Sequence, residues 1–396
     1  MGQRNMKLKK GTLIFFSLLT FLCLRRFLSY EERLDELWLH EFPLEYLTSL
    51  ETHSLNLSAR LMTTVEPARL YLEEVFNLKD TYTCELLSPS IFQDGSVYFR
   101  TLCGERGKGG FSFISKSRLT SGAIEEVTLL GLVPPSYLSY EENGFEDCRG
   151  FTWDGTSYLI CSVQSGRASR KQVAVTLGKK NQVLEFNVSG LELSRIEKNW
   201  TPLVHNRNLY FIYSFTPFIV LKCNVVDWRN FHCDVEHAEA TESVSDFTVL
   251  RGGTPCVPID HKRYLCISHG RWVYRDSRRR SKRSDSNVFF YRGLITVIGT
   301  DPWGIIGISS VLHFPQTPCS LKETQKNVEY PTGILKEGNR IILGAHFKDE
   351  ICKFFEYPNL LQQVEPFTYP VPLTHRQIES FLSQELSKIL KNPNWC

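Results

Sequence analysis

The chain has 396 residues, of which 42% are hydrophobic and 22% are charged. It can therefore bury a core, and this excludes disordered chains, collagen-like fibres and disulfide-stapled miniproteins. The formal net charge is +3, but eleven cations lie within residues 4–26 and 278–283, so the remainder is net acidic. A duplex-binding surface needs many distributed cations, and we therefore expect no nucleic acid partner.

An apolar run without charge, Gly11 to Leu24, lies near the N-terminus and is followed by Arg25-Arg26. Its length suits the hydrophobic region of a signal peptide better than a complete bilayer span. No small-residue cleavage site follows it, however. We therefore expect an uncleaved signal anchor in residues 1–30, with residues 31–396 on the lumenal side. A cleaved signal peptide, and hence a secreted protein, is the alternative.

The twelve cysteines fit an oxidising compartment, where disulfide bonds persist. No Cys-x-x-Cys pair occurs and the other spacings match no zinc-binding motif, so we expect neither a metal nor a cofactor. Asn56 and Asn187 begin Asn-x-Ser/Thr sequons and are expected to carry glycans. The third sequon, at Asn199, lies inside a motif described next and is not expected to be modified.

A fivefold pattern runs along the chain. Five short strands with period-2 alternation are predicted, starting 51 to 77 residues apart: 96–100, 157–161, 208–212, 263–267 and 340–344. Hairpin dipeptides precede three of them: Asp94-Gly95, Asp154-Gly155 and Glu337-Gly338. Ahead of each strand lies a polar motif: Ser88-Pro89-Ser90, Glu146-Asp147-Cys148-Arg149, Glu197-Lys198-Asn199-Trp200, Gly252-Gly253-Thr254-Pro255 and Glu329-Tyr330-Pro331-Thr332-Gly333.

Such repeated units are typical of propeller blades. We therefore expect an all-β fold, a five-bladed β-propeller over residues 77–372, in which the five motifs converge at the mouth of a central channel. An ordinary sandwich with similar hairpins is the alternative. Residues 31–76 are predicted to form a helical stem, and residues 373–396 a C-terminal amphipathic helix that packs on the body.

Several common catalytic motifs are absent: HExxH, GxSxG, a P-loop and the Asp-x-Asp pair with which most lumenal nucleotide-sugar transferases hold a metal. Convergence of the polar motifs would instead gather two carboxylates and several cations: Glu146, Asp147, Arg100, Arg149, Lys198 and His269. This combination suits proton transfer at a sugar oxygen beside a bound anion, and Asp147 among these cations is expected to be ionised. A structural ion pair between blades is the alternative. Trp200 and Tyr330 could stack on a sugar ring, or could simply pack in the core.

The same motifs resemble those of two carbohydrate-active families. Phe145-Glu146-Asp147-Cys148-Arg149 resembles the Glu-Asp-Pro-Arg motif of glycoside hydrolase family 130, the β-mannoside phosphorylases, and of glycosyltransferase family 108, the β-mannosyltransferases. Gly252-Gly253-Thr254-Pro255 with Ser268-His269-Gly270 resembles their Gly-x-x-Pro-Pro and Tyr-His-Gly segments. Tyr330-Pro331-Thr332-Gly333 with Gly344-Ala345-His346 and Asp349 resembles their Phe-Pro-x-Gly and Tyr-Gly-Ala-x-Asp segments.

The resemblance implies a role for each matched residue. Asp147 would be the catalytic acid or base of one inverting step, acting directly or through a sugar hydroxyl. Arg149, Lys198 and His269 would grip phosphate or the phosphates of a nucleotide. Arg100 and Asp349 would hold the glycosyl ring, and Glu146, Trp200 and Tyr330 are further candidates for substrate binding. Cys148 replaces the family's proline, and Phe347-Lys348 intrude before Asp349, which leaves the sugar and the nucleophile open.

These features predict a metal-independent type II membrane glycosyltransferase of the Golgi. Its partners would be a nucleotide-sugar or sugar-phosphate donor, a glycan acceptor and the membrane that holds its anchor. The hexose transferred is expected to be mannose. Two alternatives remain: a secreted hydrolase or phosphorylase acting on β-mannosides, and a catalytically inactive glycan-binding propeller.

A cluster of five cations, Arg278-Arg279-Arg280-Ser281-Lys282-Arg283, precedes Ser284 between the fourth and fifth units. It is compatible with a solvated loop, with a processing site for a furin-like protease, or with a loop that binds a nucleotide or a polyanionic acceptor.

Overall fold

A computed structural model describes residues 59–65, 68–71, 81–103, 111–120, 122–132, 144–166, 168–178, 181–227, 229–240, 248–275, 287–314, 326–347 and 351–391. All of these residues belong to one compact unit, 51–396. The expected anchor, Asn56, the basic cluster and Asp349 lie outside the described residues. No helix among the described residues is long and apolar enough to span a bilayer.

The strands form three hydrogen-bonded sheets. The first has six strands: β2 (Ala68–Tyr71), β3 (Thr81–Ile91), β4 (Ser96–Cys103), β5 (Phe111–Thr120), β6 (Ala123–Ile124) and β7 (Thr128–Leu132). The second has eight: β8 (Glu146–Trp153), β9 (Thr156–Gly166), β10 (Ser169–Leu177), β11 (Val183–Ser189), β12 (Thr201–His205), β13 (Asn208–Phe215), β14 (Phe218–Val225) and β15 (Asn230–Ala238).

The third sheet has nine strands and closes the array: β1 (Arg60–Val65), β16 (Thr248–Arg251), β17 (Val257–Pro258), β18 (Arg263–Arg275), β19 (Asn287–Thr300), β20 (Trp303–Val311), β21 (Lys326–Glu337), β22 (Arg340–Phe347) and β23 (Ile351–Tyr357). Short 3-10 helices, η2 (Leu360–Gln363) and η3 (Glu365–Phe367), follow β23.

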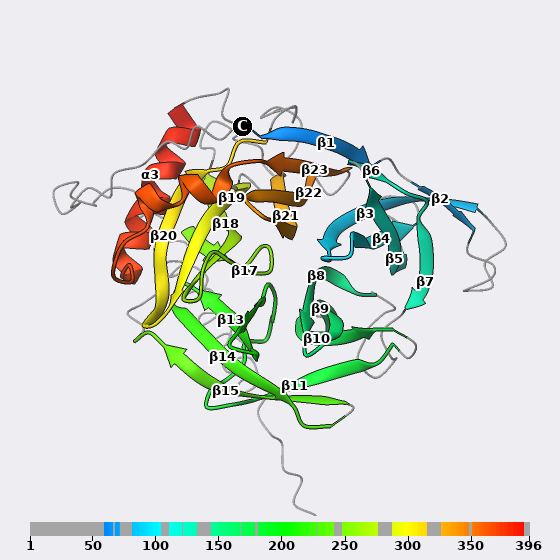
Figure 1. Ribbon diagram of the computed structural model, residues 1–396, viewed down its shortest axis with the longest axis horizontal. Helices are drawn as coiled ribbons and strands as arrows, with labels where there is room; N and C mark the ends of the chain where they lie inside the picture. Colours follow the sequence, from blue (N-terminus) through cyan, green and yellow to red (C-terminus); the bar gives the residue numbers. More distant parts are fainter. Residues whose placement is uncertain are drawn as a thin grey trace, which may run out of the picture. The chain divides into compact units, whose positions relative to one another are not determined.

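Consecutive antiparallel hairpins make up most of these sheets, and two parallel pairings join neighbouring groups, β11 with β15 and β19 with β21. The groups follow one another around a common centre (Figure 1). The circuit is completed where β21 and β22 contact β3, which in turn contacts β8. The all-β, propeller-like class predicted from the repeat is therefore confirmed, whereas the hydrogen bonding groups the five predicted units into three sheets.

All five predicted strands are present, and each lies within a longer strand: β4, β9, β13, β18 and β22, respectively. The hairpin dipeptides act as expected, because Gly95, Gly155 and Gly338 adopt φ of +79°, +72° and +60°. Glycine pays no steric penalty in this left-handed region, and so each dipeptide reverses the chain where the alternation stops.

The prediction of a helical stem over residues 31–76 is wrong for the part that the structure describes. Arg60–Val65 forms β1 and pairs with β23, and Ala68–Tyr71 forms β2 and pairs with β3. Each segment fills the open edge of an existing sheet. The unpaired backbone N–H and C=O groups of an edge strand favour the addition of another strand, and this here overrides the local preference of the sequence for helix. The sheet array thus begins before residue 77.

The predicted C-terminal helix is confirmed as α3 (His375–Lys391). Its start carries the expected capping box, in which the Thr374 backbone N–H donates to Gln377 Oε1 over 2.8 Å. The apolar stripe is buried, with Ile378 and Leu382 fully so. The Leu382 carbonyl accepts a 2.9 Å hydrogen bond from the Trp272 indole of β18, which fixes the helix on the body.

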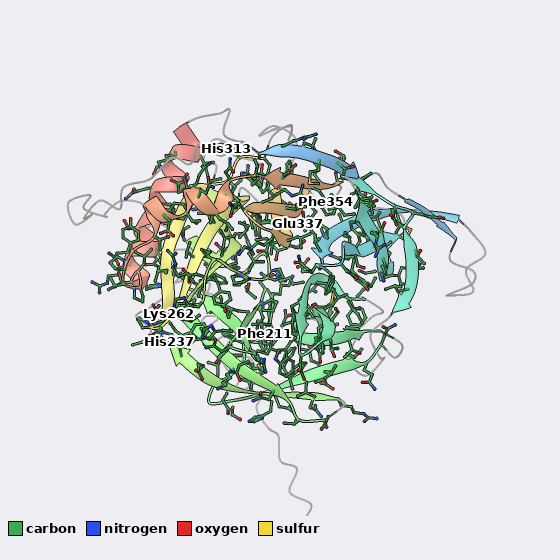
Figure 2. All side chains as sticks on the ribbon, viewed as in Figure 1. Phe211, His237, Lys262, His313, Glu337 and Phe354 are labelled. Carbon is green, nitrogen blue, oxygen red and sulfur yellow. A yellow bond between two sulfur atoms is a disulfide. The ribbon has the colours of Figure 1, made fainter. Side chains whose placement is uncertain are left out.

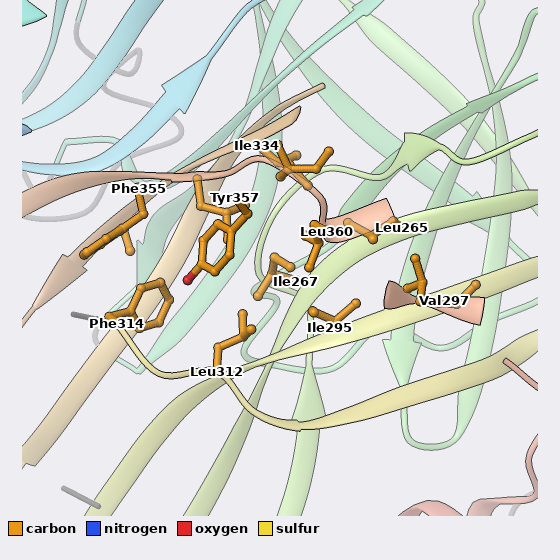
Figure 3. Packing of buried hydrophobic residues seen from close by; sticks show 14 of the residues in the cluster. Leu265, Ile267, Ile295, Val297, Leu312, Phe314, Ile334, Phe355, Tyr357 and Leu360 are labelled. Atoms are coloured by element: carbon orange, nitrogen blue, oxygen red, sulfur yellow. The ribbon is translucent and has the colours of Figure 1, made fainter. Parts of the chain in front are cut away.

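Apolar side chains fill the spaces between neighbouring groups of strands, both within a sheet and between sheets. One cluster joins β18 and β19 to β21 and β23, and Figure 3 shows members of it: Leu265, Ile267, Ile295, Val297, Ile334, Phe355 and Tyr357. Phe211 of β13 and Phe354 of β23, labelled in Figure 2, belong to two further clusters. These contacts between neighbouring groups hold the strands that carry or adjoin the polar motifs in fixed positions.

Within the part of the chain that the structure describes, three disulfides link neighbouring strands: Cys84–Cys103, Cys148–Cys161 and Cys223–Cys233. The first and third join residues that are direct partners across β3–β4 and β14–β15. The second ties β8, the strand that carries Asp147, to β9. The expectation of bridges drawn from cysteine usage is confirmed for these six residues.

Candidate functional site

Three of the polar motifs contain a residue in the left-handed backbone region, namely Ser88, Asp147 and Asn199, at φ of 48°, 49° and 66°. The strand register shifts between Leu87 and Ser90 and again between Glu146 and Arg149, at the first two of these sites. Asn and Asp tolerate this conformation better than most side chains, and such outliers are concentrated at functional sites. The two bulges therefore set Ser88 and Asp147 apart from the regular alternation of their strands, and Asn199 lies just before β12.

Hydrogen bonds connect the motifs to one another. Ser90 Oγ donates to the Cys148 carbonyl over 2.9 Å, and Thr332 Oγ1 donates to the Pro89 carbonyl over 3.0 Å. Ser88 Oγ lies 3.4 Å from His346 Nδ1. The motifs, far apart in the sequence, thus come together as the repeat predicted.

Arg149 is the hub of this arrangement and is completely buried. Its guanidinium donates to five acceptors: the Asp147 carbonyl (2.7 Å), Asn199 Oδ1 (3.0 Å), the Gly252 carbonyl (3.1 Å), the Tyr330 hydroxyl (2.7 Å) and the Gly253 carbonyl. Four of the five motifs meet at this one side chain. A group so enclosed holds the site together, whereas the sequence suggested that it would grip a phosphate.

Glycine is required where the fourth motif approaches. A Cβ on Gly252 would lie 2.1 Å from the Asn199 carbonyl oxygen, and one on Gly253 would lie 2.2 Å from the Ile267 carbonyl oxygen. Both contacts are with backbone, which cannot move aside easily. The pair of glycines thus permits the close approach that brings their carbonyls to Arg149.

Glu146 lies between two arginines. Arg100 Nη2 is 3.2 Å from Glu146 Oε1, and Arg170 pairs with Glu146 Oε2. Arg100 also donates to Ser112 Oγ over 3.0 Å, which orients its guanidinium. All three charged side chains remain partly exposed, at 13% to 21%. They form a charged cluster that, unlike Arg149, solutes can reach.

The charge on Asp147 is set by these neighbours. Burial alone would raise the pKa of the Asp147 carboxyl, but the positive charges of Lys198, Arg100 and Arg149 outweigh it, and the pKa is lowered. Burial lowers the pKa of the Lys198 ammonium, and Asp147 opposes that shift. Asp147 is therefore ionised at neutral pH, as the sequence analysis expected.

His269 is buried beside Tyr330, with ring centroids 4.6 Å apart. Burial, together with the charges of Arg251 and Arg149, holds the pKa of the His269 imidazole well below its usual range. The ring is therefore neutral at physiological pH. The expectation that His269 adds a positive charge to the site is corrected, because the site's cations and its burial both disfavour protonation.

Two aromatic residues proposed from sequence take different positions. The Tyr330 hydroxyl bonds to Arg149 and Asn199 within the network. Trp200 is 1% exposed in the hydrophobic core, in tilted ring contacts with Phe186 and Phe211 and an edge-to-face contact with Tyr213. Its indole donates to Glu197 over 2.8 Å. The core-packing alternative therefore holds for Trp200, whose ring has no free face for a sugar.

Arg170 and Asn199 are the residues that the sequence did not indicate as parts of the site. Arg170 lies on β10, outside every motif, and reaches Glu146 only because β9 and β10 pair. Asn199 is inside the third motif, and its bond from Arg149 reveals its role. Within the described residues no group of three acidic, histidine or cysteine side chains is arranged to hold a metal.

The fold is similar to that of solved carbohydrate-active proteins. A glycosyl hydrolase from Bacteroides ovatus matches with a TM-score of 0.53 and 14% identity, covering 74% of this chain and 90% of that one. A second similar structure comes from glycoside hydrolase family 130. This family of mannoside phosphorylases contains glycoside hydrolases that target β-1,2-mannosidic linkages in Candida mannan. The structure matches with a TM-score of 0.51 and 12% identity. That match covers 84% of this chain and 98% of the other.

The sequence is similar to that of β-mannosyltransferases. The family model of that name matches residues 159–289, which include Arg170, Lys198 and His269 but not Asp147. Beta-mannosyltransferase 2 of Komagataella phaffii is 36% identical over 91 residues, 22% of this chain. The matched segment spans 14% of the length of that relative. The resemblance to β-mannosyltransferases and to family 130 proteins that the motifs indicated is thus confirmed.

Proposed function

We propose that this protein is an inverting, metal-independent mannosyltransferase that moves mannose from a nucleotide-sugar or sugar-phosphate donor to a glycan. The observation that carries the proposal is the ionised carboxylate of Asp147, held on a strained bulge of β8 among Lys198, Arg100 and Arg149. An ionised carboxylate can accept a proton but has none to donate, and this favours transfer to an acceptor hydroxyl over hydrolysis or phosphorolysis, in which the leaving sugar oxygen needs an acid.

In the proposed step an acceptor hydroxyl oxygen attacks the anomeric carbon, and the bond from that carbon to the phosphate oxygen breaks. The hydroxyl proton passes to Asp147, directly or through a sugar hydroxyl, and then to water. The phosphate leaves with the electron pair of the broken bond. Lys198, Arg100 and Arg170 balance the negative charge that develops on it.

The remaining residues have supporting roles in this proposal. Arg149 and Asn199 fix the backbone around Asp147, and the Tyr330 hydroxyl completes their network. Glu146 orients Arg100 and Arg170 until an anion competes for them. Asp349 remains a candidate for binding the glycosyl ring, as its motif suggested.

We further propose that the five hairpin groups are five blades and that residues 1–30 anchor the protein in the Golgi membrane with its body in the lumen. The closed circuit of contacts and the two parallel joins support the blades. The charge pattern around Gly11 to Leu24 supports the anchor. The three disulfides suit an oxidising lumen. Asn56 and Asn187 are proposed as the glycosylation sites of the protein.

The test is a donor screen on the full-length protein, with nucleotide sugars and hexose 1-phosphates against mixed glycan acceptors. Asp147→Asn should remove transfer while leaving the fold unchanged. Asp154→Asn is the matched control, because Asp154 also has a left-handed backbone, at φ 48°, but is exposed in the β8–β9 turn. Equal loss in both variants, or full turnover by Asp147→Asn, would refute the assignment.

The same screen separates the other functions. Release of mannose or of mannose 1-phosphate from β-mannosides, with no transfer from nucleotide sugars, would establish a hydrolase or a phosphorylase. Binding to glycans without turnover of any donor would establish an inactive binding module. Activity should persist in EDTA, and its abolition would contradict the metal-independent mechanism.

A further inference from the structure

Two cysteines outside the site face each other across a hairpin. Cys256 directly follows the fourth motif, and Cys266 lies on β18, fully buried. The pairing of β17 with β18 matches Val257 with Leu265 and Pro258 with Tyr264. Continued by one residue, this antiparallel register sets Cys256 opposite Cys266, and both are free thiols in the structure.

The ladder shows which kind of pair they form. The Ile259 N–H donates to the Arg263 carbonyl over 2.8 Å, so that pair is hydrogen-bonded. Because hydrogen-bonded and non-hydrogen-bonded pairs alternate, Cys256 and Cys266 occupy a non-hydrogen-bonded position. In agreement, the Cys256 N–H points away from β18 and donates to the Pro202 carbonyl over 2.9 Å. Such positions bring Cα atoms to about 4.5 Å, within the range that a disulfide spans.

Two bridges in this chain have the same geometry. Cys84–Cys103 and Cys223–Cys233 join direct cross-strand partners, with Cα atoms 4.2 and 4.1 Å apart. Cys223 and Cys233 are separated by ten residues in the sequence, as are Cys256 and Cys266. We propose that Cys256 and Cys266 form a fourth cross-strand disulfide, in the hairpin that presents Gly252 and Gly253 to Arg149.

The bond would form by exchange with a disulfide carrier, either a small organic disulfide such as oxidised glutathione or a protein of the disulfide oxidoreductase class. The thiolate of Cys256, the more exposed of the two, attacks a carrier sulfur and releases one carrier thiolate. Cys266 then displaces the second. Two electrons pass to the carrier, which leaves as two thiols with the two protons.

Burial raises the pKa of the Cys256 thiol, and so little thiolate exists once the hairpin is packed. Exchange is therefore expected during folding, before β18 is covered. The completed bridge would fix the strand on which the two glycine carbonyls of the site depend.

The test uses full-length protein made through a eukaryotic secretory pathway, unfolded in the presence of an alkylating agent at lysis and never reduced. The alkyl groups, one for each free thiol, are counted by mass in the wild type and in Cys256→Ser/Cys266→Ser. Equal counts support the bridge, because the double variant then removes no thiol. Two more thiols in the wild type overturn it. Cys223→Ser/Cys233→Ser serves as the matched control and should also leave the count unchanged.

Peptide mapping of the wild type gives a second measurement that does not require the variant to fold. A crosslinked peptide pair containing Cys256 and Cys266, which separates on reduction, is the expected result. Alkylated Cys256 and Cys266, or a link from either to another cysteine, would overturn the proposal.

Discussion

Arg149 offers the sharpest test of the structure, because the motif resemblance and the three-dimensional contacts give it different roles. As a phosphate ligand it should affect donor affinity and little else. As the buried hub of the site it should mainly affect stability. Arg149→Met separates the two roles, since methionine fills a similar volume but donates no hydrogen bond.

The size of the effect follows from the groups left behind. Five acceptors lose their donor, and three of them are backbone carbonyls of Asp147, Gly252 and Gly253. Each buried polar group without a partner costs about 1–3 kcal/mol. The guanidinium no longer has to be desolvated, which offsets part of this loss. We expect a net loss of about 4 kcal/mol in the free energy of unfolding.

Thermal unfolding followed by tryptophan fluorescence measures this loss. For a body of roughly 300 residues, about 4 kcal/mol corresponds to a fall in Tm of about 6 °C. Arg170→Gln is the control, because Arg170 is partly exposed and its main partner is Glu146. That variant should keep the wild-type Tm and weaken binding of an anionic donor.

Two results would refute the reasoning. One is a Tm for Arg149→Met within 1 °C of the wild type together with lost donor affinity. The other is a larger fall for Arg170→Gln than for Arg149→Met. If Arg149→Met does not fold, Tyr330→Phe removes two bonds of the same network and should lower stability by about 1–2 kcal/mol.

Three further predictions concern pH, a disulfide and a glycan. The pKa of Asp147 is lowered in the folded state, so its ionised carboxylate stabilises the fold at pH values above the ordinary pKa of an aspartate. This contribution to the free energy of unfolding is lost as the pH falls through the folded-state pKa. The acid limb of the pH profile of kcat/KM should accordingly lie below about pH 4. Lys198→Gln removes the charge that lowers the pKa of Asp147 most, and should therefore move this limb to higher pH. An unchanged limb would contradict the reasoning. Replacing Cys148 and Cys161 together by alanine opens a loop with a separation of 13 residues and should cost about 3 kcal/mol in urea unfolding. Asn187→Gln should remove one glycan in a mobility assay without changing turnover, since Asn187 is exposed on β11; equal mobility would exclude that glycan.

The sequence by itself determined the features that depend on neighbours along the chain. Period-2 alternation and the Asp-Gly and Glu-Gly turns predicted β4, β9 and β22, because pleating and positive φ are local properties. The capping box and apolar stripe predicted α3 in the same way. The charge of Asp147 also followed from the sequence, once the repeat suggested which cations would surround it.

The tertiary structure decided whatever depends on burial and on distant partners. The sequence predicted a helical stem that included Arg60–Val65 and Ala68–Tyr71, yet these segments form β1 and β2 because open sheet edges accept them. Arg170 carries no motif and joins the site only through the pairing of β9 with β10. The enclosure of Arg149 and the neutral charge of His269 result from desolvation by side chains far away in the sequence, and the core position of Trp200 results from the packing of Phe186, Phe211 and Tyr213 around it. Alternation and turn patterns do not encode that desolvation, which arises only when the sheets close around a common centre.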